Sequence, residues 1–488
     1  MRRIRLWLAL VALGGVPLMD LARSSSLLSS SLLANQEKGD AKKDDAKKKD
    51  AEEEKFQVPP PPADNLAIPE DLPERERDLL REVTQEFEGL RQVHSPRDIK
   101  KLVRSLKKAN RIAKSSPLPD YYLGIGYQWQ RDYDLAFKAL TMSLEKSPTF
   151  YEAWVELGDV HVWQNNLTEA VVCYDKALEL YPYYDYGLSR KSQVLIQLGR
   201  FEEAQPVLEL AIQVKGTPTL TYMQMTLEKV RAGPDWKTTF VCESDNYIVK
   251  SGISQEFADE IGKRAELIRR LYDLYFSKMA KPDRKFVIIV FKDKEEYQAA
   301  GSPPGSAGYY NPWFRQLYLY KHKNSADTFL VMNHEALHQY LHDYLERAPQ
   351  WLNEGLGDFF GPSEYIAKGR KEYMRIRPNW WRLDGLKNAV RRNRLSSASE
   401  LMQMSQKEMY NPRTKGLNYA QAWGLVYYCL EGGREKYKTT LQKYYKLLSK
   451  GKTSHEAYRR TFARIDMGRF EKDWRNFISK IEFRKPSN

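Results

Sequence analysis

Two histidines and a glutamate in the C-terminal half of the chain have the types and spacing of a hydrolytic metal site. Residues 333–343 read NHEALHQYLHD, in which His334 and His338 are four residues apart among apolar residues at helical spacing. On a helix, both imidazoles project from one face and can reach one tetrahedral zinc ion. Glu335 is rotated by about 100° from His334, which places its carboxylate near a metal-activated water rather than on the metal. We therefore expect Glu335 to act as a general base.

A third ligand follows sixteen residues after His338. Glu354 lies in the segment WLNEGLGDFF, at the expected start of a second helix, and the chain around Pro349 is long enough to bring that helix back beside the first. Two His and one Glu with an open fourth position form the ligand set of hydrolytic zinc sites, whereas a structural zinc ion is enclosed by four ligands that usually include Cys. The sequence thus predicts one zinc ion bound by His334, His338 and Glu354.

These residues lie in a segment, 234–488, that we expect to fold as one α+β domain, because strands come first and helices follow. β-branched and alternating patterns predict the early elements. The expected elements are strands at Thr238–Cys242 and Tyr247–Lys250, a helix at Ser254–Lys278, a buried strand at Phe286–Phe291, and a hairpin of Tyr309–Trp313 and Gln316–Tyr320. All of the chain after the hairpin is expected to be helical.

Four sequence pieces in this domain resemble those of the gluzincin metallopeptidases, in particular the peptidase MA-like domains found in exported bacterial proteins, often beside tetratricopeptide repeats. The pieces are AGYY (307–310), HEALHQ (334–339), WLNEGLGDFF (351–360) and NYAQAWGLVYY (418–428). The resemblance implies a zincin-like fold and assigns the three metal ligands and the base as above. It also implies that Asp358 orients a ligand histidine and that the hydroxyl of Tyr419 stabilises the oxyanion.

Other residues are weaker candidates for a role in metal binding, catalysis or substrate binding. His342 continues the spacing of the histidines, but it is one further turn along the helix and is expected to lie past the metal. His455 is a second candidate for the oxyanion, after Tyr419. The strand that contains Tyr309 and Tyr310 is expected to present an edge to which an extended peptide substrate can add as a further strand.

Upstream, the chain repeats itself with a period of 34 residues. The matching positions include Ala136, Ala170 and Ala204, and also Gly124 and Gly158. Small residues let paired helices pack closely, and the period resembles that of the tetratricopeptide repeat. We therefore expect an all-α solenoid of such repeats over 117–233, clearest in 117–215, preceded by a helical segment, 69–116. Two roles remain open for it: a surface that binds a peptide or protein partner, or a spacer that supports the next domain.

The N-terminus has the pattern of an export signal. Three arginines precede an apolar run, Leu6–Met19, which is shorter than the roughly 20 residues that a membrane-spanning helix needs. We expect a signal peptide over 1–34, cleaved near Ala22 or Ala34, and secreted or periplasmic protein with no stable membrane span. Residues 35–68 are rich in Lys, Asp, Glu and Pro and are expected to form a disordered linker.

The chain has 488 residues, which favours several domains, and a net charge of +14. It contains no basic run interleaved with aromatic residues, so we expect no nucleic-acid partner. The sequence therefore predicts an exported zinc-dependent peptidase that hydrolyses peptide bonds with a metal-activated water and uses repeats to recruit substrate or a partner. The alternative is a non-catalytic repeat scaffold that carries a vestigial zinc-binding domain.

Overall fold

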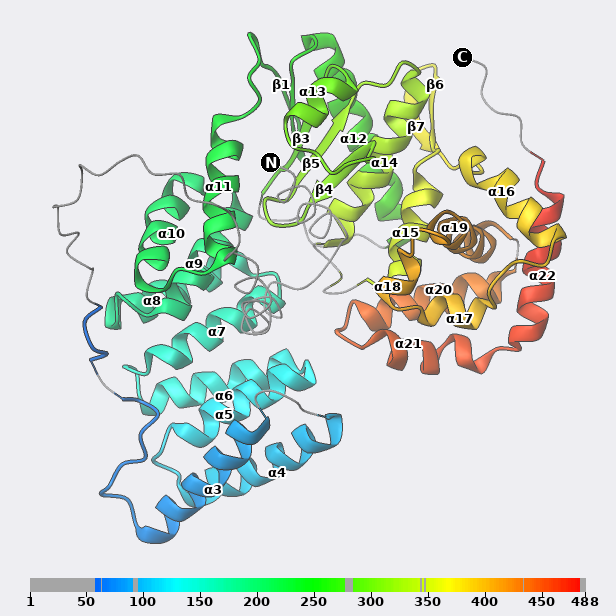
Figure 1. Ribbon diagram of the computed structural model, residues 1–488. Coiled ribbons are helices and arrows are strands. Elements are labelled where there is room, and N and C mark those ends of the chain that lie inside the picture. The colour runs from blue at the N-terminus through cyan, green and yellow to red at the C-terminus, as the bar shows by residue number, and fades with distance from the viewer. Residues whose placement is uncertain are drawn as a thin grey trace, which may run out of the picture. The chain divides into compact units, whose positions relative to one another are not determined.

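The structure is a computed structural model, and it describes residues 58–62, 64–90, 95–276, 284–342, 345, 348–432 and 434–482. The expected signal peptide, 1–34, and most of the expected linker, 35–68, lie outside these residues. The described chain forms two compact units that divide between Gly233 and Pro234 (Figure 1). Within the described residues, no helix combines the length and apolarity needed to cross a membrane.

The N-terminal unit is a helical solenoid in which successive helices pack against one another (Figure 1). Its helices are α3 (Glu74–Leu90), α4 (Pro96–Ile112), α5 (Leu118–Gln130), α6 (Tyr133–Lys146), α7 (Tyr151–Trp163), α8 (Leu167–Leu180), α9 (Asp185–Leu198), α10 (Phe201–Lys215) and α11 (Pro218–Ala232). The pairs α5/α6, α7/α8 and α9/α10 recur at 34 residues, as the sequence predicts. The helix pair α3/α4 precedes them, and α11 follows.

Equivalent positions in these pairs have equivalent surroundings. A Cβ atom on Gly124 would lie 2.5 Å from the side chain of Leu140, and one on Gly158 would lie 2.5 Å from that of Tyr174. Both pairs of residues are related by the 34-residue period, so the first and second helices of each repeat approach closely at the same point. The second helix of each pair buries the predicted alanine completely: Ala136, Ala170 and Ala204. The predicted repeat geometry is confirmed.

A buried charge links two of the repeats. The carboxylate of Asp159 in α7 accepts hydrogen bonds of 2.6 Å from Nε of Arg190 in α9 and from the hydroxyls of Tyr174 and Tyr186. Asp159 and Arg190 are both buried. A buried carboxylate is costly unless it is paired and hydrogen-bonded, and here three donors satisfy it. The second repeat is therefore held to the third by polar contacts as well as by apolar packing.

The C-terminal unit contains a mixed sheet with the strand order β1-β2-β3-β5-β4. Its strands are β1 (Phe240–Glu243), β2 (Tyr247–Ser251), β3 (Phe286–Phe291), β4 (Gly308–Asn311) and β5 (Gln316–Tyr320). The central strands β2, β3 and β5 are parallel, while β1 and β4 pair antiparallel to them at the two edges. These strands agree with the predicted ones, and β4 and β5 form the predicted hairpin.

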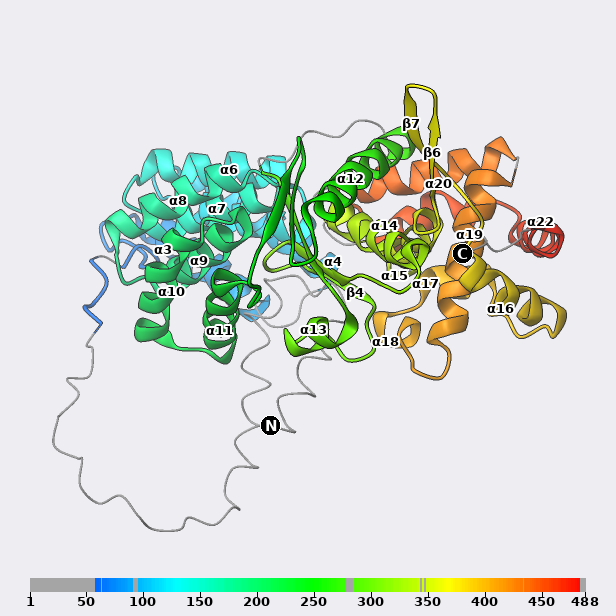
Figure 2. The ribbon, with the colours of Figure 1, turned by 90° about the horizontal axis from the view of Figure 1, so that it is seen from above.

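Helices cover both faces of this sheet (Figure 2). They are α12 (Gln255–Phe276), α13 (Lys294–Ala299) and α14 (Ser325–His342). Ile288 of β3 and Leu317 of β5 lie in one core with residues of α12 and α14, whereas Ile289 and Phe291 of β3 pack with Tyr297 of α13 on the other face. Because apolar residues line both faces of β3, its sequence is a continuous apolar run. The sheet therefore supports α14, the helix that carries the HEALH segment.

The expectation that only helices follow β5 is wrong. Strands β6 (Glu364–Lys368) and β7 (Lys371–Arg375) form an antiparallel hairpin. A two-residue loop joins them, and its first residue, Gly369, has φ +60°, a backbone conformation that favours glycine in such turns. Their high content of charged residues hides the alternation that a strand normally shows. Glu364 and Arg375 lie opposite each other and form a 2.7 Å ion pair, so charge pairing contributes to the hairpin.

The remaining helices pack around a second apolar core that includes Trp351, Trp423 and Trp474. They are α15 (Gln350–Phe360), α16 (Trp380–Arg391), α17 (Ala398–Gln403), α18 (Gln406–Met409), α19 (Lys415–Glu431), α20 (Glu435–Leu448), α21 (Ser454–Arg460) and α22 (Met467–Lys480). Helix α15 packs against α14 on one side and α19 on the other. It is thus the element that joins the sheet-covering helices to the helical core.

Candidate metal centre

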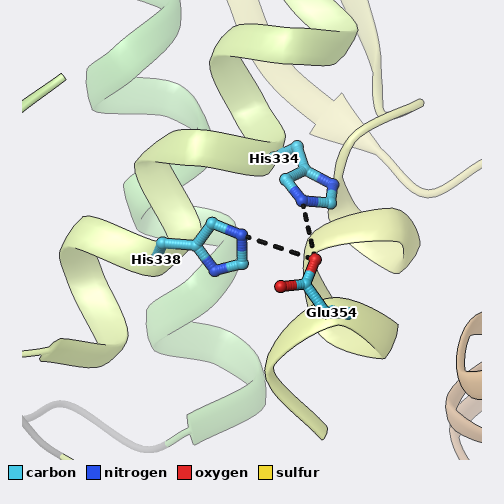
Figure 3. Close-up of side chains that lie close together, drawn as sticks. All are labelled: His334, His338 and Glu354. Carbon is cyan, nitrogen blue, oxygen red and sulfur yellow. Dashed lines mark ion pairs between the residues drawn. The ribbon is translucent and has the colours of Figure 1, made fainter. Parts of the chain in front are cut away.

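The three predicted metal ligands come from two neighbouring helices. His334 and His338 lie one turn apart on α14, and Glu354 lies on α15 (Figure 3). Small residues allow α15 to come close: a Cβ on Gly357 would lie 2.7 Å from the His334 ring, and one on Gly355 would lie 2.7 Å from a backbone oxygen of α19. The glycines of the WLNEGLGDFF segment therefore let α15 fit between the imidazole and α19.

The donor atoms of the three residues converge. Oε2 of Glu354 lies 3.5 Å from Nε2 of His334 and 3.8 Å from Nε2 of His338. All three ligand atoms lie within 4.8 Å of one another. Zinc bonds of about 2.0–2.2 Å in tetrahedral geometry separate two ligand atoms by about 3.3–3.6 Å. The two measured separations are close to this value, so the arrangement fits a single zinc ion.

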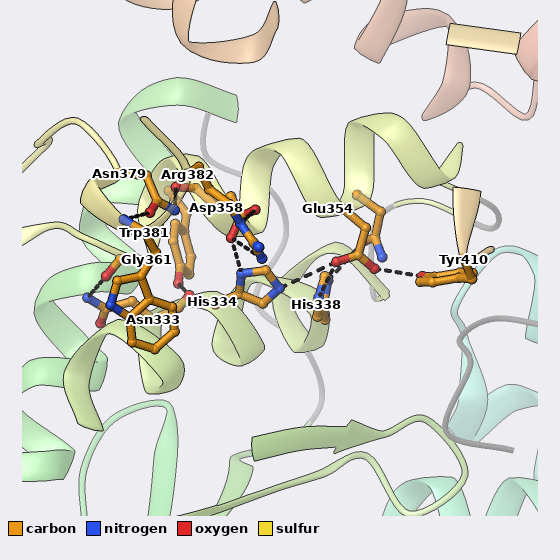
Figure 4. Close-up of polar contacts among 12 residues, drawn as sticks. Asn333, His334, His338, Glu354, Asp358, Gly361, Asn379, Trp381, Arg382 and Tyr410 are labelled. Carbon is orange, nitrogen blue, oxygen red and sulfur yellow. Dashed lines mark hydrogen bonds and ion pairs between the residues drawn. The ribbon is translucent and has the colours of Figure 1, made fainter. Parts of the chain in front are cut away.

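The other ring nitrogen of each histidine contacts an acceptor. Nδ1 of His334 lies 3.3 Å from Oδ1 of Asp358, and Nδ1 of His338 lies 3.1 Å from the side-chain oxygen of Asn353 (Figure 4). With a metal ion bound, an acceptor at Nδ1 would keep the proton there and leave the lone pair of Nε2 for the ion. Both Nε2 atoms face Glu354, as metal binding requires. Asp358 occupies the place that the resemblance implies, whereas Asn353 was not predicted.

Helix α16 fixes Asp358 in turn. Nε of Arg382 donates a 2.7 Å hydrogen bond to Oδ2 of the buried Asp358, and the side-chain amide of Asn379 donates to the Asp358 backbone oxygen at 3.0 Å (Figure 4). The side chain of Asn379 also caps the N-terminus of α16 by accepting from the backbone N–H of Trp381. The orientation of His334 thus depends on a chain of contacts that ends in another helix.

A tyrosine holds the ligand carboxylate from the opposite side. The hydroxyl of Tyr410 lies 2.6 Å from Oε1 of Glu354 and 2.7 Å from the side-chain oxygen of Gln350. It has one proton, and the carboxylate is the stronger acceptor because it is charged. Oε1 of Glu354 is therefore bonded to Tyr410, while Oε2 faces the two imidazoles (Figure 4).

The charges at the centre favour a cation among the three side chains. Burial alone raises the pKa of Glu354, but the hydrogen bond from His334 and the charge of His338 lower it to about 2. Burial alone lowers the pKa of His334, but hydrogen bonds to Asp358 and Glu354 raise it to about 10. The carboxylates therefore stabilise positive charge on the imidazole of His334, and a metal ion can supply that charge in place of a proton.

Glu335 lies beside the three ligands and is not one of them. Its Oε2 accepts a 3.1 Å hydrogen bond from the backbone N–H of Tyr310 in β4. This contact joins the side chain to an edge strand of the sheet.

The other predicted residues have different positions. Tyr419 is a buried residue of α19, its ring centroid is 6.1 Å from that of Tyr410, and its side chain is hydrogen-bonded to Glu354. Burial and the charge of Glu354 raise the pKa of Tyr419, so its hydroxyl remains a donor. Nδ1 of His342 lies 2.7 Å from the Tyr310 hydroxyl, and His342 is outside the ligand cluster. His455 is an exposed residue of α21 and is likewise outside the cluster.

Sequence reasoning missed three residues that contact the ligands or their partners: Asn353, Arg382 and Tyr410. Asn353 directly precedes Glu354, so the WLNEG segment contains a local indication of its role. Arg382 and Tyr410 lie 28 and 56 residues after Glu354, and only the folded chain brings them close.

Different family models match the two units of the chain. Residues 329–450, which contain His334, Glu335, His338 and Glu354, match a family model described as a protein of unknown function (DUF1570). Residues 151–184 and 187–217 match two models of the tetratricopeptide repeat. The N-terminal unit therefore contains tetratricopeptide repeats, which suggest a protein-interaction scaffold.

Among curated proteins, the chain is similar to the protein SGT1 homologue of Oryza sativa subsp. japonica, with 34% identity over 79 residues, or 16% of this chain and 22% of that protein. The chain thus spans about a fifth of the length of this relative. Solved structures with some similarity include a thermophilic tetratricopeptide-repeat protein of Thermus thermophilus, with 16% identity, a TM-score of 0.27 and coverage of 32% of this chain and 83% of that one. Another is a mutant O-GlcNAc transferase of Thermobaculum terrenum, with 14% identity and a TM-score of 0.26. The similarity covers 47% of this chain and 41% of that one.

Proposed function

We propose that the C-terminal unit is a zinc-dependent peptidase with a zincin-like fold of the gluzincin type. The observation that carries this proposal is the convergence of His334, His338 and Glu354 on one point, with Glu335 beside them. The outward ring nitrogens of both histidines contact acceptors, as in metal sites whose ligand histidines are held in one tautomer. Three protein ligands leave a fourth position for water or substrate, which is the arrangement of hydrolytic zinc sites.

A zinc ion bound by these ligands would supply Lewis acidity, which polarises a carbonyl group and lowers the pKa of water. Glu335 would take the proton from the attacking water and later donate it to the leaving amine. The N–H of Tyr310 holds one oxygen of this carboxylate, so the side chain is oriented before substrate binds. Tyr419 is our candidate for the oxyanion donor, because the resemblance implies this role and its hydroxyl stays protonated beside Glu354.

An extended peptide is the substrate form that the neighbouring strand favours. Within the described residues, β4 is an edge strand that pairs only with β5, so its other side has main-chain groups outside the sheet pairing. Such an edge can bind a peptide as an additional strand. Because the N–H of Tyr310 already contacts Glu335, we expect the peptide to use the remaining outward groups of Gly308–Asn311.

Export is part of the proposal and depends on residues 1–34, which lie outside the described chain. Arg2, Arg3, Arg5 and the apolar run after them support a signal peptide. Mature protein isolated from the periplasm or the medium should therefore begin between residues 20 and 40. Recovery of cytoplasmic protein with an intact Met1 would contradict export without affecting the proposed chemistry.

The test of the activity is zinc content together with cleavage of an unfolded protein substrate by the purified full chain. We expect one zinc ion per chain, cleavage that stops on treatment with a chelator, and recovery when zinc is restored. The alternative is a repeat scaffold, which the tetratricopeptide matches favour on their own. Stoichiometric zinc with no cleavage of a broad peptide library would support that alternative.

A further inference from the structure

The segment before α3 runs across the ends of the repeat helices. We call residues 58–62 and 64–66 the strap. The backbone oxygen of Pro59 accepts a 2.9 Å hydrogen bond from the hydroxyl of Tyr181, which directly follows α8. The side-chain amide of Asn65 donates a 2.9 Å hydrogen bond to Glu152 in the first turn of α7 and lies 3.5 Å from the backbone oxygen of Thr149. The strap thus contacts the two turns that flank the α7/α8 repeat (Figure 1, dark blue).

The surface under the strap is rich in tyrosine. The ring of Tyr151 lies 5.4 Å from that of Tyr181 and 4.9 Å from that of Tyr184, and the rings of Tyr181 and Tyr184 are stacked at 6.3 Å. Tyr151 begins α7, while Tyr181 and Tyr184 lie between α8 and α9. We call these three tyrosines and Glu152 the tyrosine surface. It combines aromatic faces, tyrosine hydroxyls and one carboxylate within two adjacent inter-repeat turns.

The composition of the strap suits this surface. Residues 59–62 are four consecutive prolines, which favour the extended polyproline II conformation and lose little conformational entropy on binding. Proline has no N–H, so the backbone oxygens in such a run have no local donor and remain available to an external one. The Tyr181 hydroxyl is such a donor. Aromatic-lined surfaces bind proline-rich segments in the same way in other proteins.

The strap offers Glu152 a neutral donor. Glu152 is 7% exposed, and burial raises its pKa, although hydrogen bonds from Asn65, from the Glu152 backbone N–H and from Tyr151 oppose this effect. The neighbouring Asp64 adds a negative charge that raises the pKa of Glu152 further. Asn65 offers a neutral donor, whereas a lysine or arginine would form a charge-assisted hydrogen bond, which is roughly twice as strong. A peptide that combines prolines with a basic residue at this point would therefore fit the surface better than the strap does.

We propose that the tyrosine surface is a binding site for an extended, proline-rich peptide with a basic side chain directed at Glu152, and that the strap is its internal occupant. The strap is covalently attached, so its effective concentration is high and it reduces the apparent affinity for any peptide from another molecule. Binding of a partner requires displacement of the strap. This role goes beyond the proposed peptidase activity and is independent of the metal centre.

The experiment measures binding of a fluorescein-labelled peptide with the sequence of residues 58–68, altered by Asp64→Ser and Asn65→Lys. The protein is the full chain, either unchanged or as a strap variant that combines Asn65→Ala with serine in place of each of the four prolines, 59–62. If the strap occupies the surface about nine-tenths of the time, the peptide should bind the strap variant about ten-fold more tightly than the unchanged chain. Equal affinities would overturn the proposal.

Changes in the surface provide the matched controls. In the strap variant, Glu152→Gln should weaken peptide binding about ten-fold or more, because it removes a charge-assisted contact, and Tyr181→Phe should weaken it several-fold. Glu179→Gln, at an exposed acid of α8, should leave binding unchanged. Variants are compared only if their thermal unfolding matches that of the strap variant. Binding that persists unchanged with Glu152→Gln would place the peptide elsewhere and contradict the proposal.

Hydrogen exchange tests displacement in the unchanged chain. The amides of Leu66 and Ala67 donate to the side-chain and backbone oxygens of Asp64. Saturating peptide should accelerate exchange of these two amides as the strap leaves the surface. A peptide that binds without changing their exchange would show that the strap and the peptide do not compete.

Discussion

The hydroxyl of Tyr410 lies 2.6 Å from Oε1 of Glu354, the oxygen that faces away from the two ligand imidazoles. This hydrogen bond fixes the rotation of the carboxylate so that Oε2 lies 3.5 Å from Nε2 of His334. A carboxylate held in this way is oriented for one metal bond before the ion arrives. Tyr410 therefore positions the proposed ligand Glu354, and it does so from a segment that local sequence patterns do not connect with the motif.

The first prediction follows from this contact. Tyr410→Phe should weaken zinc binding about ten- to a hundred-fold, the usual effect of losing a hydrogen bond to a metal ligand. Competition with a chelating dye at equilibrium measures the affinity. Tyr373→Phe, at an exposed tyrosine of β7, is the control and should bind zinc like the unchanged protein. Equal zinc affinity in both variants would show that Tyr410 does not position Glu354.

A second prediction concerns Asp358, which lies between His334 and Arg382. Asp358→Ala removes the acceptor at Nδ1 of His334 and leaves the guanidinium of Arg382 without this carboxylate. We expect zinc affinity to fall about ten- to a hundred-fold. Arg382→Gln leaves the contact between Asp358 and His334 in place, so it should have a smaller effect. If Arg382→Gln lowers zinc affinity more than Asp358→Ala does, the contact between Asp358 and His334 is not what orients the imidazole.

The third prediction is a pH dependence that involves His342. Burial and the charges of Arg315 and Arg284 lower the pKa of His342 to about 3, and its Nδ1 contacts the Tyr310 hydroxyl. Between pH 3 and about 6.5 the unfolded chain then binds more protons at this residue than the folded chain does, so this residue destabilises the fold as pH falls through that range. Between pH 7 and pH 5, the free energy of unfolding of the unchanged protein should fall by about 1 kcal/mol more than that of His342→Gln. This value allows for the partial exposure of His342.

Calorimetry at the two pH values measures this difference. The Gln variant keeps a polar contact with Tyr310 but cannot titrate, so groups other than His342 affect both proteins equally. If the two proteins show the same loss of stability from pH 7 to pH 5, the imidazole is not held in its neutral form.

A fourth prediction concerns the repeats. Gly158→Ala would place a Cβ 2.5 Å from the ring of Tyr174, so we expect it to destabilise the N-terminal unit by about 1–3 kcal/mol. Gly89→Ala, in a helix position with no heavy atom within 4 Å of the added Cβ, should instead be neutral or slightly stabilising. Thermal unfolding of the two variants compares them directly. Equal effects would mean that close helix approach does not explain the repeated glycine.

The convergence of His334, His338 and Glu354 could be predicted because their spacing in the sequence is local. His334 and His338 are related by one helical turn, and Glu354 lies in a short segment whose glycines permit close packing. The repeats could also be predicted from the 34-residue period, because each repeat packs its helices together at the same small residues. The early strands were predicted because their β-branched and apolar residues match a sheet covered on both faces.

Features that depend on distant segments could not be predicted. Arg382 and Tyr410 reach the centre only because α16 and the turn after α18 are brought to α15 by the helical core. The hairpin of β6 and β7 was missed because most residues of its strands are charged or exposed, and only Met374 is buried in the helical core. Gly369 was the one local indication of its turn.

The most direct test of the central claim compares Glu335→Gln with the unchanged chain, measuring bound zinc and the rate of peptide cleavage in the same preparations. Because Glu335 lies beside the ligands and is not one of them, both proteins should hold one zinc ion with equal affinity. Cleavage by the variant should be about 10²–10⁴-fold slower, because the proton acceptor is lost. Loss of zinc in the variant, or cleavage at an unchanged rate, would contradict the assignment of Glu335 as the base of a zinc peptidase.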